Sequence, residues 1–250
     1  MTVRPRMART PEVCHSEQLH REESAIRRDS VVIYPKNMFT GIIEEVGRVT
    51  RITSNGENRR VQIEAAQVPQ QLTTGASVSV SGVCLTALDI SKDTFHADLA
   101  PETWTRTSFS RLKAGALVNL ELPMPANGRF DGHIVQGHVD GVGQLKAFDR
   151  VADSENWWLT LELPSELEKY VVHKGSISIE GISLTVAKLE SRNCSVAIIP
   201  HTVEMTNLKS LKPGDPLNLE MDVIAKYVEK MTRSAVGSTL TIERLVSEGF

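Results

Sequence analysis

The chain has 250 residues, of which 40% are hydrophobic and 24% are charged, and its formal net charge is −3. This length allows one large or two small domains, and the small negative charge gives no basic excess for binding nucleic acid or anionic lipid. No apolar run approaches the roughly 18 residues of a membrane span, so a membrane protein is not expected either.

The cysteines are an odd number, Cys14, Cys84 and Cys194, and no CxxC motif occurs. A disulfide framework is therefore not expected, and the cysteine usage fits a reducing compartment. The predicted location is cytoplasmic.

Residues 1–37 mix basic and acidic side chains without a periodic apolar pattern. They lack the apolar region of a secretory signal and are too acidic for a transit peptide. We interpret residues 1–37 as a disordered N-terminal extension, or as an upstream start ahead of a true start at Met38. A leader or a regulatory tail is the alternative.

From Met38 onward the sequence contains an internal repeat. The matching stretches are GVCLTA (82–87) with GISLTV (181–186), LKAGALVNLE (112–121) with LKPGDPLNLE (211–220), and TGIIEEVGRV (40–49) with QGHVDGVGQL (136–145). Three matches in the same order predict two copies of one unit, residues 38–132 and 133–229, each large enough for a small domain.

Both copies show the alternation of β-strands. Valine or isoleucine alternates with serine at the matching stretches 77–81 and 176–180, and Trp157, Leu159 and Leu161 share one face of another strand. Closing several short strands into a barrel removes exposed edges. The predicted fold class is therefore all-β, with two tandem similar β-barrels.

The stretch DVIAKYVEKM (222–231) instead spaces its apolar residues as an amphipathic helix does. Such a helix can cover a barrel or join subunits. Its place after both copies favours a subunit contact, and residues 230–250 are assigned to a C-terminal helical tail.

Common catalytic signatures such as GxSxG, the P-loop and HExxH are missing from the sequence. His133 and His138 are five residues apart, which on a strand places them on opposite faces. No metal site is expected from them.

What remains is a set of polar residues that differ between matched positions of the two copies. Cys84 matches Ser183, His138 matches Ile42, and Ser77 lies near Ile177 if one gap is allowed. The first copy thus offers a thiol and a hydroxyl, joined by a histidine that opens the second copy.

The second copy offers the amine of Lys174 and the carboxylates of Glu180 and Asp222, and Asp222 stands where the first copy has Pro123. Each residue alone has an ordinary explanation, since a single cysteine is most often a small buried side chain and a lysine a solvated one. Together they predict two near-identical pockets for two near-identical ligands that play different roles.

Five segments in this order resemble riboflavin synthase of the alpha-chain type: MFTGIIEEVG (38–47), GVCLTA (82–87), GHIVQGHVDG (132–141), KGSISIEGISLTV (174–186) and IPHTVEMTNL (199–208). The resemblance implies two six-stranded Greek-key barrels and a C-terminal α-helix. It also implies a homotrimer, with lumazine synthase as a further candidate partner.

The implied reaction converts two molecules of 6,7-dimethyl-8-ribityllumazine into riboflavin and 5-amino-6-(D-ribitylamino)uracil without an external cofactor. The active site is expected between the N-terminal barrel of one subunit and the C-terminal barrel of a neighbour. His138 is expected to move the proton of the 7-methyl group, assisted by Ser77 or Cys84. The nucleophile stays open between Cys84, Ser77, water and a ribityl hydroxyl.

The resemblance carries catalytic roles onto His138, Cys84, Ser77 and Asp222. The substrate-binding residues that it implies are Gly41, Ile42, Ile43, Cys84, Leu85, Thr86, Asp98, Leu99, Ala100, Pro101, Glu102, Thr103, Gly137, His138, Val139, Lys174, Ser183, Leu184, Thr185, Ile199, Pro200, His201, Thr202, Val203 and Glu204.

One residue departs from the family pattern, because Glu180 stands where the family often has aspartate. The extra methylene shifts the carboxylate, so Glu180 is left out of the predicted site. The rival functions are a lumazine- or flavin-binding antenna protein without catalysis, and a barrel that transports an unrelated small ligand.

Overall fold

The computed structural model describes residues 38–236. The predicted N-terminal extension, including Cys14, and residues 237–250 of the predicted helical tail lie outside the described residues. Among the helices of the described part, none is long and apolar enough to cross a membrane.

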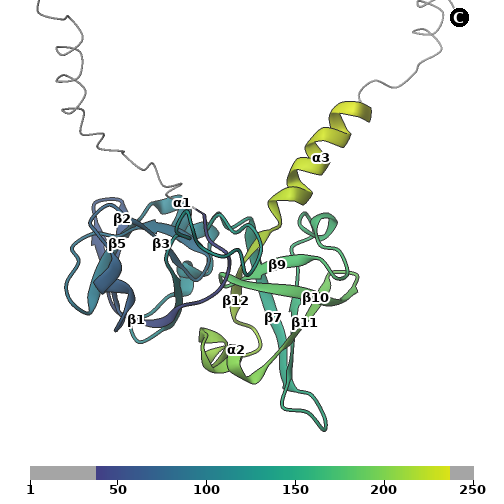
Figure 1. Ribbon diagram of the computed structural model, residues 1–250, viewed down its shortest axis with the longest axis horizontal. Helices are drawn as coiled ribbons and strands as arrows, with labels where there is room; N and C mark the ends of the chain where they lie inside the picture. The colour runs from purple at the N-terminus through teal and green to yellow at the C-terminus, as the bar shows by residue number, and fades with distance from the viewer. Residues whose placement is uncertain (1–37, 237–250) are drawn as a thin grey trace, which may run out of the picture. The chain divides into compact units, whose positions relative to one another are not determined.

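The first copy is a sheet of six antiparallel strands in the order β4-β3-β6-β1-β2-β5 (Figure 1). Its end strands β4 and β5 are joined beyond the ladder by a single bridge between Leu88 and His96. The strands are β1 (Glu45–Asn55), β2 (Asn58–Glu64), β3 (Ser77–Val80), β4 (Val83–Thr86), β5 (Thr94–Leu99) and β6 (Leu117–Glu121).

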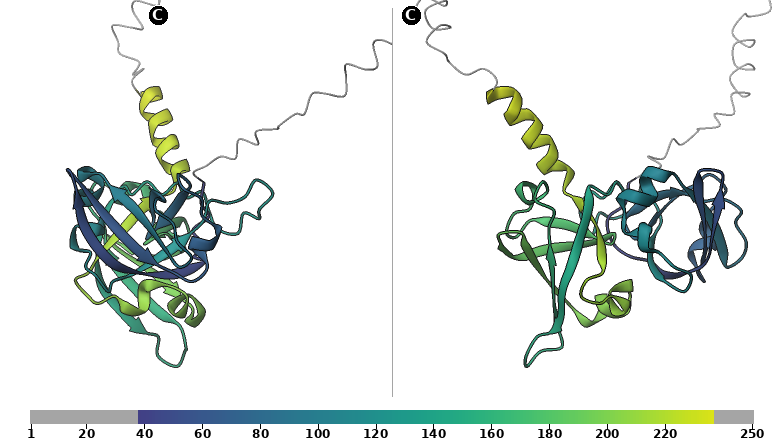
Figure 2. Two further views of the ribbon diagram at one scale, coloured as in Figure 1. Left: turned by 90° about the vertical axis from the view of Figure 1, so that its left-hand side faces the viewer. Right: turned by 180° about the vertical axis from the view of Figure 1, so that it is seen from behind.

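The second copy is a closed barrel in the order β10-β11-β8-β7-β12-β9. The strands are β7 (Gly141–Arg150), β8 (Trp157–Glu162), β9 (Ser176–Ile179), β10 (Ile182–Glu190), β11 (Asn193–Ile198) and β12 (Pro216–Met221). When the strands of each copy are numbered from its own first strand, both copies have the same cyclic order. The duplication seen in the sequence is thus repeated in the topology, and Figure 2 shows the two sheets from two further sides.

Short helices also recur at matching positions. The fifth strand of each copy leads into a short α-helix, α1 (Pro101–Arg106) or α2 (Pro200–Glu204). Single 3-10 turns complete the copies at Val68–Gln71, Ser108–Arg111, Glu168–Tyr170 and Asn207–Ser210. The all-β prediction with six strands in each copy is confirmed, and the structure adds that only the second ladder is continuous around its barrel.

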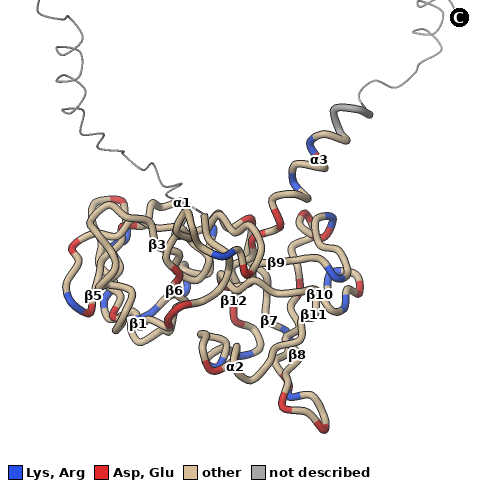
Figure 3. Tube along the Cα trace, viewed as in Figure 1, with Lys and Arg blue, Asp and Glu red and all other residues tan. Residues whose placement is uncertain are grey.

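Each copy buries its own apolar core. Phe95, Leu99 and Leu120 are fully buried in the first core, and Leu161 and Ile177 are fully buried in the second. Basic and acidic residues are interspersed along both sheets (Figure 3).

Hydrogen bonds from buried asparagine side chains to backbone carbonyls connect the two copies. Asn119 Nδ2 donates to the carbonyl of Glu180, and at the matching position Asn218 Nδ2 donates to the carbonyl of Ser81, both at 2.9 Å. The Glu180 carboxylate accepts from Asn218 N at 2.7 Å and from Asn207 Nδ2 at 3.0 Å. Glu180 therefore lies in the contact between the copies, where burial raises its pKa.

Helix α3 (Val223–Val236) follows β12 directly and confirms the helix expected at 222–231. Lys226 Nζ lies 2.7 Å from the Asp140 carboxylate, and Glu229 contacts Lys169 and Tyr170, so one face of α3 is tied to the second barrel. Within residues 223–232 of α3, the large apolar side chains that are exposed are Ile224, Tyr227, Val228 and Met231.

Candidate active site

Two short segments that precede the barrels cross between them. We call residues 39–43 arm 1 and residues 135–139 arm 2. The arms pair through Phe39 and Val135, whose N–H groups donate to each other's carbonyls at 2.8 and 3.1 Å. Ile43 of arm 1 packs against the core of the second copy, and Val139 of arm 2 packs against the core of the first. Each arm therefore serves the opposite barrel.

The first candidate site is centred on Cys84 of β4. Its neighbours Val83 and Leu85 are buried in the first core, which leaves Cys84 half-buried on the other face of the strand. The Ser77 hydroxyl hydrogen-bonds to Cys84, but burial is the larger effect and raises the pKa of the thiol. The structure thus brings together two of the predicted catalytic residues and keeps the thiol protonated at neutral pH.

Arm 2 lies directly on Cys84. The Cys84 N–H donates to Gly137 O at 2.8 Å. Gly137 has a positive φ of 76°, and a Cβ at this residue would lie 2.6 Å from Cys84 Cβ, so only glycine fits. His138 follows Gly137 in arm 2 and has an exposed side chain, so it lies one residue from the backbone contact with Cys84.

The second candidate site has the same backbone geometry around Ser183 of β10. The Ser183 N–H donates to Gly41 O of arm 1 at 2.8 Å, and a Cβ at Gly41, whose φ is 77°, would lie 2.7 Å from Ser183 Cβ. The predicted match between Cys84 and Ser183 is thus present in three dimensions.

The register corrects the match suggested for Ser77. Ser77 pairs with Thr86, and Ser176 pairs with Thr185 in the same way. The repeat partner of Ser77 is therefore Ser176 and not Ile177, because the two hairpins align without a gap.

His133 is a residue of the second site that the sequence reasoning missed. Its Nδ1 lies 2.7 Å from Ser183 Oγ, and its buried Nε2 has no hydrogen-bond partner among residues 38–236. Burial lowers the pKa of His133, while the nearby Asp222 carboxylate raises it less. The imidazole is therefore neutral next to the Ser183 hydroxyl.

The expected strand geometry of the two histidines was wrong. His133 and His138 lie outside the named strands, in the segment that crosses between the copies, and one is buried while the other is exposed. The signal that could have found His133 is its place in GHIVQGHVDG, one of the quoted family segments.

Asp222 acts on the second site, and Lys174 N bonds to Val186 of β10, the strand that carries Ser183. Lys174 is exposed and has a φ of 66°, whereas the first copy has Gly75 with a φ of 87° at the matching position. Asp222 Oδ1 accepts from Ile224 N at 2.9 Å and so caps helix α3. Its carboxylate acts on His133 through space, which links the start of the helix to the site.

Several predicted binding residues have side chains that are engaged elsewhere. The Asp98 carboxylate accepts from Arg60 Nε at 2.7 Å and Nη2 at 2.8 Å, and this ion pair lowers its pKa. Leu85 and Leu99 are buried in the first core. Only the backbone of Leu85 and Leu99 can face a ligand on the outer side of the strands. The contact of Asp98, Leu85 and Leu99 with substrate stays a prediction.

The other predicted residues lie at matching places around each site. Ala100 and Ile199 precede α1 and α2, which begin with Pro101 and Pro200 and contain the predicted Glu102, Thr103, His201, Thr202, Val203 and Glu204. Thr86 and Thr185 are exposed, Leu184 packs partly against the second core, and Ile42 and Ile199 expose 47% and 55% of their surface. Both sites are therefore open on their outer sides.

A cavity of about 910 Å³ lies beside arm 1. Thr40, Ile42, Ser77, Glu121 and Met124 are among its lining residues, which do not include Cys84 or Ser183. The cavity therefore borders the first site at Ser77 and contacts arm 1, and all of its lining residues belong to the first copy.

Comparison with known proteins agrees with the duplicated architecture. Residues 40–123 and 136–222 each match the family model described as the lumazine binding domain. The chain is 44% identical over 217 residues to riboflavin synthase of Actinobacillus pleuropneumoniae, which covers 85% of this chain and all of that protein.

Riboflavin synthase of Mycobacterium tuberculosis (strain ATCC 25618 / H37Rv) is 44% identical over 203 residues, or 79% of this chain and all of that protein. The Bacillus subtilis protein of the same name is 36% identical over 217 residues, or 85% of this chain and all of that protein. Among solved structures, LumP complexed with riboflavin has a TM-score of 0.68 at 24% identity and covers 74% of this chain and 99% of that chain. At this identity the likeness to LumP establishes the shared fold.

Proposed function

The chain belongs to the lumazine-binding domain family, and we propose that it catalyses the riboflavin synthase reaction. In this reaction one molecule of 6,7-dimethyl-8-ribityllumazine donates a four-carbon unit to a second molecule, which yields riboflavin and 5-amino-6-(D-ribitylamino)uracil. The chain is thus a transferase that uses one compound both as donor and as acceptor.

One observation carries the proposal: Cys84 and Ser183 occupy equivalent strand positions beneath equivalent arm glycines, yet their polar surroundings differ. A duplicated template supplies two sites for one ligand, and the unequal side chains give the bound molecules unequal roles. Holding both heterocycles in register replaces a bimolecular encounter with a positioned one.

In the first site we assign proton transfer to His138, with Ser77 and Cys84 as its neighbours. The raised pKa of Cys84 keeps the thiol protonated, which disfavours it as the nucleophile in the resting site and leaves Ser77, water or a ribityl hydroxyl. The thiol can still donate a hydrogen bond to a ring heteroatom.

In the second site we assign ligand binding to Lys174, Ser183 and the α2 segment, and an electrostatic role to Asp222. Neutral His133 can accept a hydrogen bond from the Ser183 hydroxyl through Nδ1. This would fix the direction from which the hydroxyl oxygen accepts a hydrogen bond from the ligand. The site can in this way discriminate donors from acceptors on the bound ring.

We assign residues 38–132 and 133–229 to the two lumazine-binding copies. We also propose that the chain is a homotrimer in the cytoplasm, in which the first site of one subunit faces the second site of a neighbour. The open sides of both sites and the exposed apolar face of α3 support this assembly. Lumazine synthase, whose product would be the substrate here, is the candidate protein partner.

The test is to incubate the purified chain with 6,7-dimethyl-8-ribityllumazine alone and to follow riboflavin absorbance. We expect one riboflavin for every two lumazines, with turnover impaired in His138→Ala and Cys84→Ala. His96→Gln is the matched control, since His96 bonds to the Asp89 carbonyl outside the proposed site and should leave turnover intact.

Tight lumazine binding without riboflavin would overturn the enzyme proposal and favour an antenna-type binding protein. Turnover that neither substitution changes would keep the reaction but remove His138 and Cys84 from its chemistry.

A further inference from the structure

Each crossing arm is held by a buried glutamate from its own copy. Glu121 at the end of β6 accepts from Thr40 N at 2.6 Å, from Thr40 Oγ1 at 2.9 Å and from Gly41 N at 3.1 Å. Glu220 of β12 accepts from Gln136 N at 2.7 Å, Gly137 N at 2.9 Å and His138 N at 3.1 Å. Only 3% of Glu121 and 2% of Glu220 are exposed.

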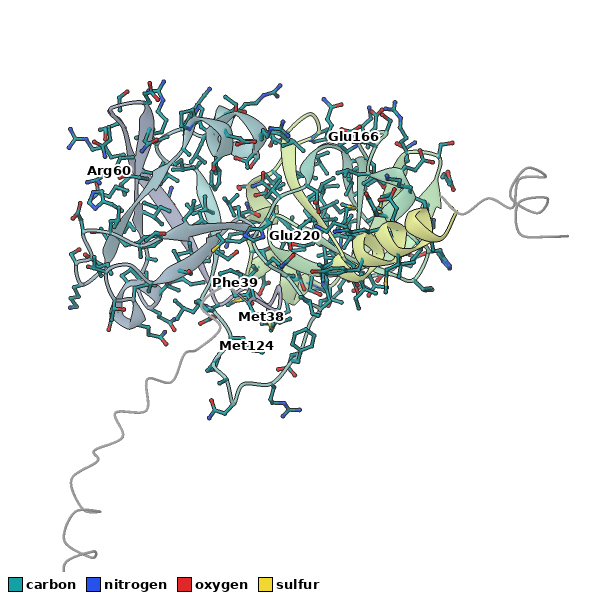
Figure 4. All side chains as sticks on the ribbon, turned by 90° about the horizontal axis from the view of Figure 1, so that it is seen from above. Met38, Phe39, Arg60, Met124, Glu166 and Glu220 are labelled. Carbon is teal, nitrogen blue, oxygen red and sulfur yellow. The ribbon has the colours of Figure 1, made fainter. Side chains whose placement is uncertain are left out.

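The two carboxylates are equivalent in the repeat, and Figure 4 shows Glu220 where the N-terminal and C-terminal halves meet. Consecutive backbone N–H groups converge on each carboxylate because Gly41 and Gly137 have positive φ. Hydrogen bonds to a buried carboxylate are among the stronger ones in proteins, and losing the acceptor leaves several donors unpaired.

The arms connect these carboxylates to the opposite sites. Glu220 belongs to the second barrel, but Gly137, which it holds together with His138, lies on Cys84 of the first. Glu121 belongs to the first barrel, but the residue that it holds, Gly41, lies on Ser183 of the second.

We propose that Glu121 and Glu220 are positioning residues that act crosswise: Glu220 sets the geometry of the Cys84 site, and Glu121 sets the geometry of the Ser183 site. The consequence for catalysis rests on the proposed function. The crosswise control of geometry does not, and it is measured separately.

The test reads the accessibility of a thiol in each site of the full-length chain. The first reporter is Cys84 itself in a Cys14→Ser background, where the other cysteine, Cys194, is fully buried in the second core. The second reporter combines Cys14→Ser, Cys84→Ser and Ser183→Cys, which moves the thiol to the matching position of the second site. Each reporter is combined with Glu121→Gln or Glu220→Gln and treated with a small thiol reagent.

Reaction rates are measured across pH, and the limiting rate of the fully ionised thiolate is compared. This separates the position of the arm from electrostatics, since the charge of Glu220 also raises the pKa of Cys84. We expect Glu220→Gln to change the limiting rate of Cys84 by about tenfold or more, the scale of losing charge-assisted hydrogen bonds, with little effect on the second reporter. Glu121→Gln should do the reverse.

Glu121→Gln and Glu220→Gln make the same change at matching positions of the two copies, so each variant is the control for the other. Equal changes at both reporters, or no change at either, would overturn the crosswise proposal. If a glutamine variant fails to fold, Glu220→Asp and Glu121→Asp keep the charge but withdraw the carboxylate from the arm N–H groups by one methylene, and they should give the same crossed pattern. If the thiol rates show the crossed pattern but the unsubstituted chain makes no riboflavin, this inference is kept and the proposed function is rejected.

Discussion

Lys174 has a left-handed backbone that its repeat partner Gly75 adopts without strain. The two positions match in their bonding, since Lys174 N donates to Val186 O and Gly75 N donates to Ala87 O, both at 2.8 Å. A side chain in this conformation costs about 1–2 kcal/mol. The ligand-binding role proposed for Lys174 in the second site would account for a lysine at this strained position.

We therefore expect Lys174→Gly to lower turnover by about tenfold or more, the scale of one lost charged contact. The free energy of unfolding should stay within about 1 kcal/mol of the original, because relief of strain and the backbone entropy of glycine offset each other. Urea unfolding and steady-state kinetics measure the two quantities. Unchanged turnover in the glycine variant would leave Lys174 with no role in the reaction.

For single residues, the sequence predicted which side chains belong to a site better than it predicted their contacts. Cys84 and Ser77 do come together, but the Asp98 carboxylate is bound by Arg60, and the role of His133 was recognised from its bond to Ser183 in the structure. Sequence spacing reports which strand face a residue occupies. It does not report which loop from another part of the chain covers that face.

The hairpins β3–β4 and β9–β10 show how element predictions succeed and fail. Their strands lie where the alternation placed them, but Ser79 and Ser178 are each only 1% exposed although they alternate with the core residues. The two hairpins lie at the contact between the copies, as the bonds of Ser81 and Glu180 show. The outer side of each hairpin, which would be exposed to solvent in an isolated barrel, is therefore covered by the other copy.

Helix α3 carries a prediction about assembly. Ile224 and Val228 are one helical turn apart and more than half exposed, on a helix whose other face is tied to the second barrel. Changing both to glutamate should shift the proposed trimer to monomers, because burying charge at an apolar contact is costly. Sedimentation velocity measures the state, and riboflavin formation should fall with it because the proposed active site needs two subunits.

Lys230→Glu is the control, a charge change on the same helix outside the apolar stripe. A double variant that remains trimeric would show that α3 does not hold the subunits together.

For the whole molecule, Glu180 supports the contact between the two copies, because its carboxylate holds Asn207 and Asn218, whose side chains bond to Asn119 and Ser81 of the first copy. Glu180→Ala removes the acceptor for Asn218 N and Asn207 Nδ2, which are both buried. We expect the free energy of unfolding to fall by about 2–4 kcal/mol, since buried donors are left unpaired. Denaturant unfolding measures the change, Glu180→Asp should cost less, and an alanine variant as stable as the original would contradict this role.

The arm carboxylates predict how stability depends on pH. Burial raises the pKa of both Glu121 and Glu220 to about 7, against an ordinary value of 4.5. Between these values the folded chain holds protons that the unfolded chain has released, so these groups make the fold more stable as pH falls from 8 to 5. Their contribution is complete below 4.5 and is lost as pH rises through 7.

The measurement compares the original chain with the double variant Glu121→Gln and Glu220→Gln by denaturant unfolding at several pH values. The original should gain stability relative to the variant as pH falls from 8 to 5, while turnover falls because the protonated acids hold the arms less tightly. Parallel stability curves for the two proteins would show that these carboxyls have ordinary pKa values.

The sequence alone determined the duplication, the strand content, the terminal helix and the family, because repeated letters and hydrophobic periods are local properties of the chain. It also determined that Cys84 and Ser183 are equivalent, since both follow the same glycine in matched hairpins.

Only the tertiary structure decided that the arms cross, that Glu121 and Glu220 hold them, and that Glu180 lies between the copies. These features depend on contacts between residues about 60 to 140 positions apart in the chain. Hydrogen bonds at such separations follow from how each copy folds and how the two copies pack together, which no local pattern of residues records.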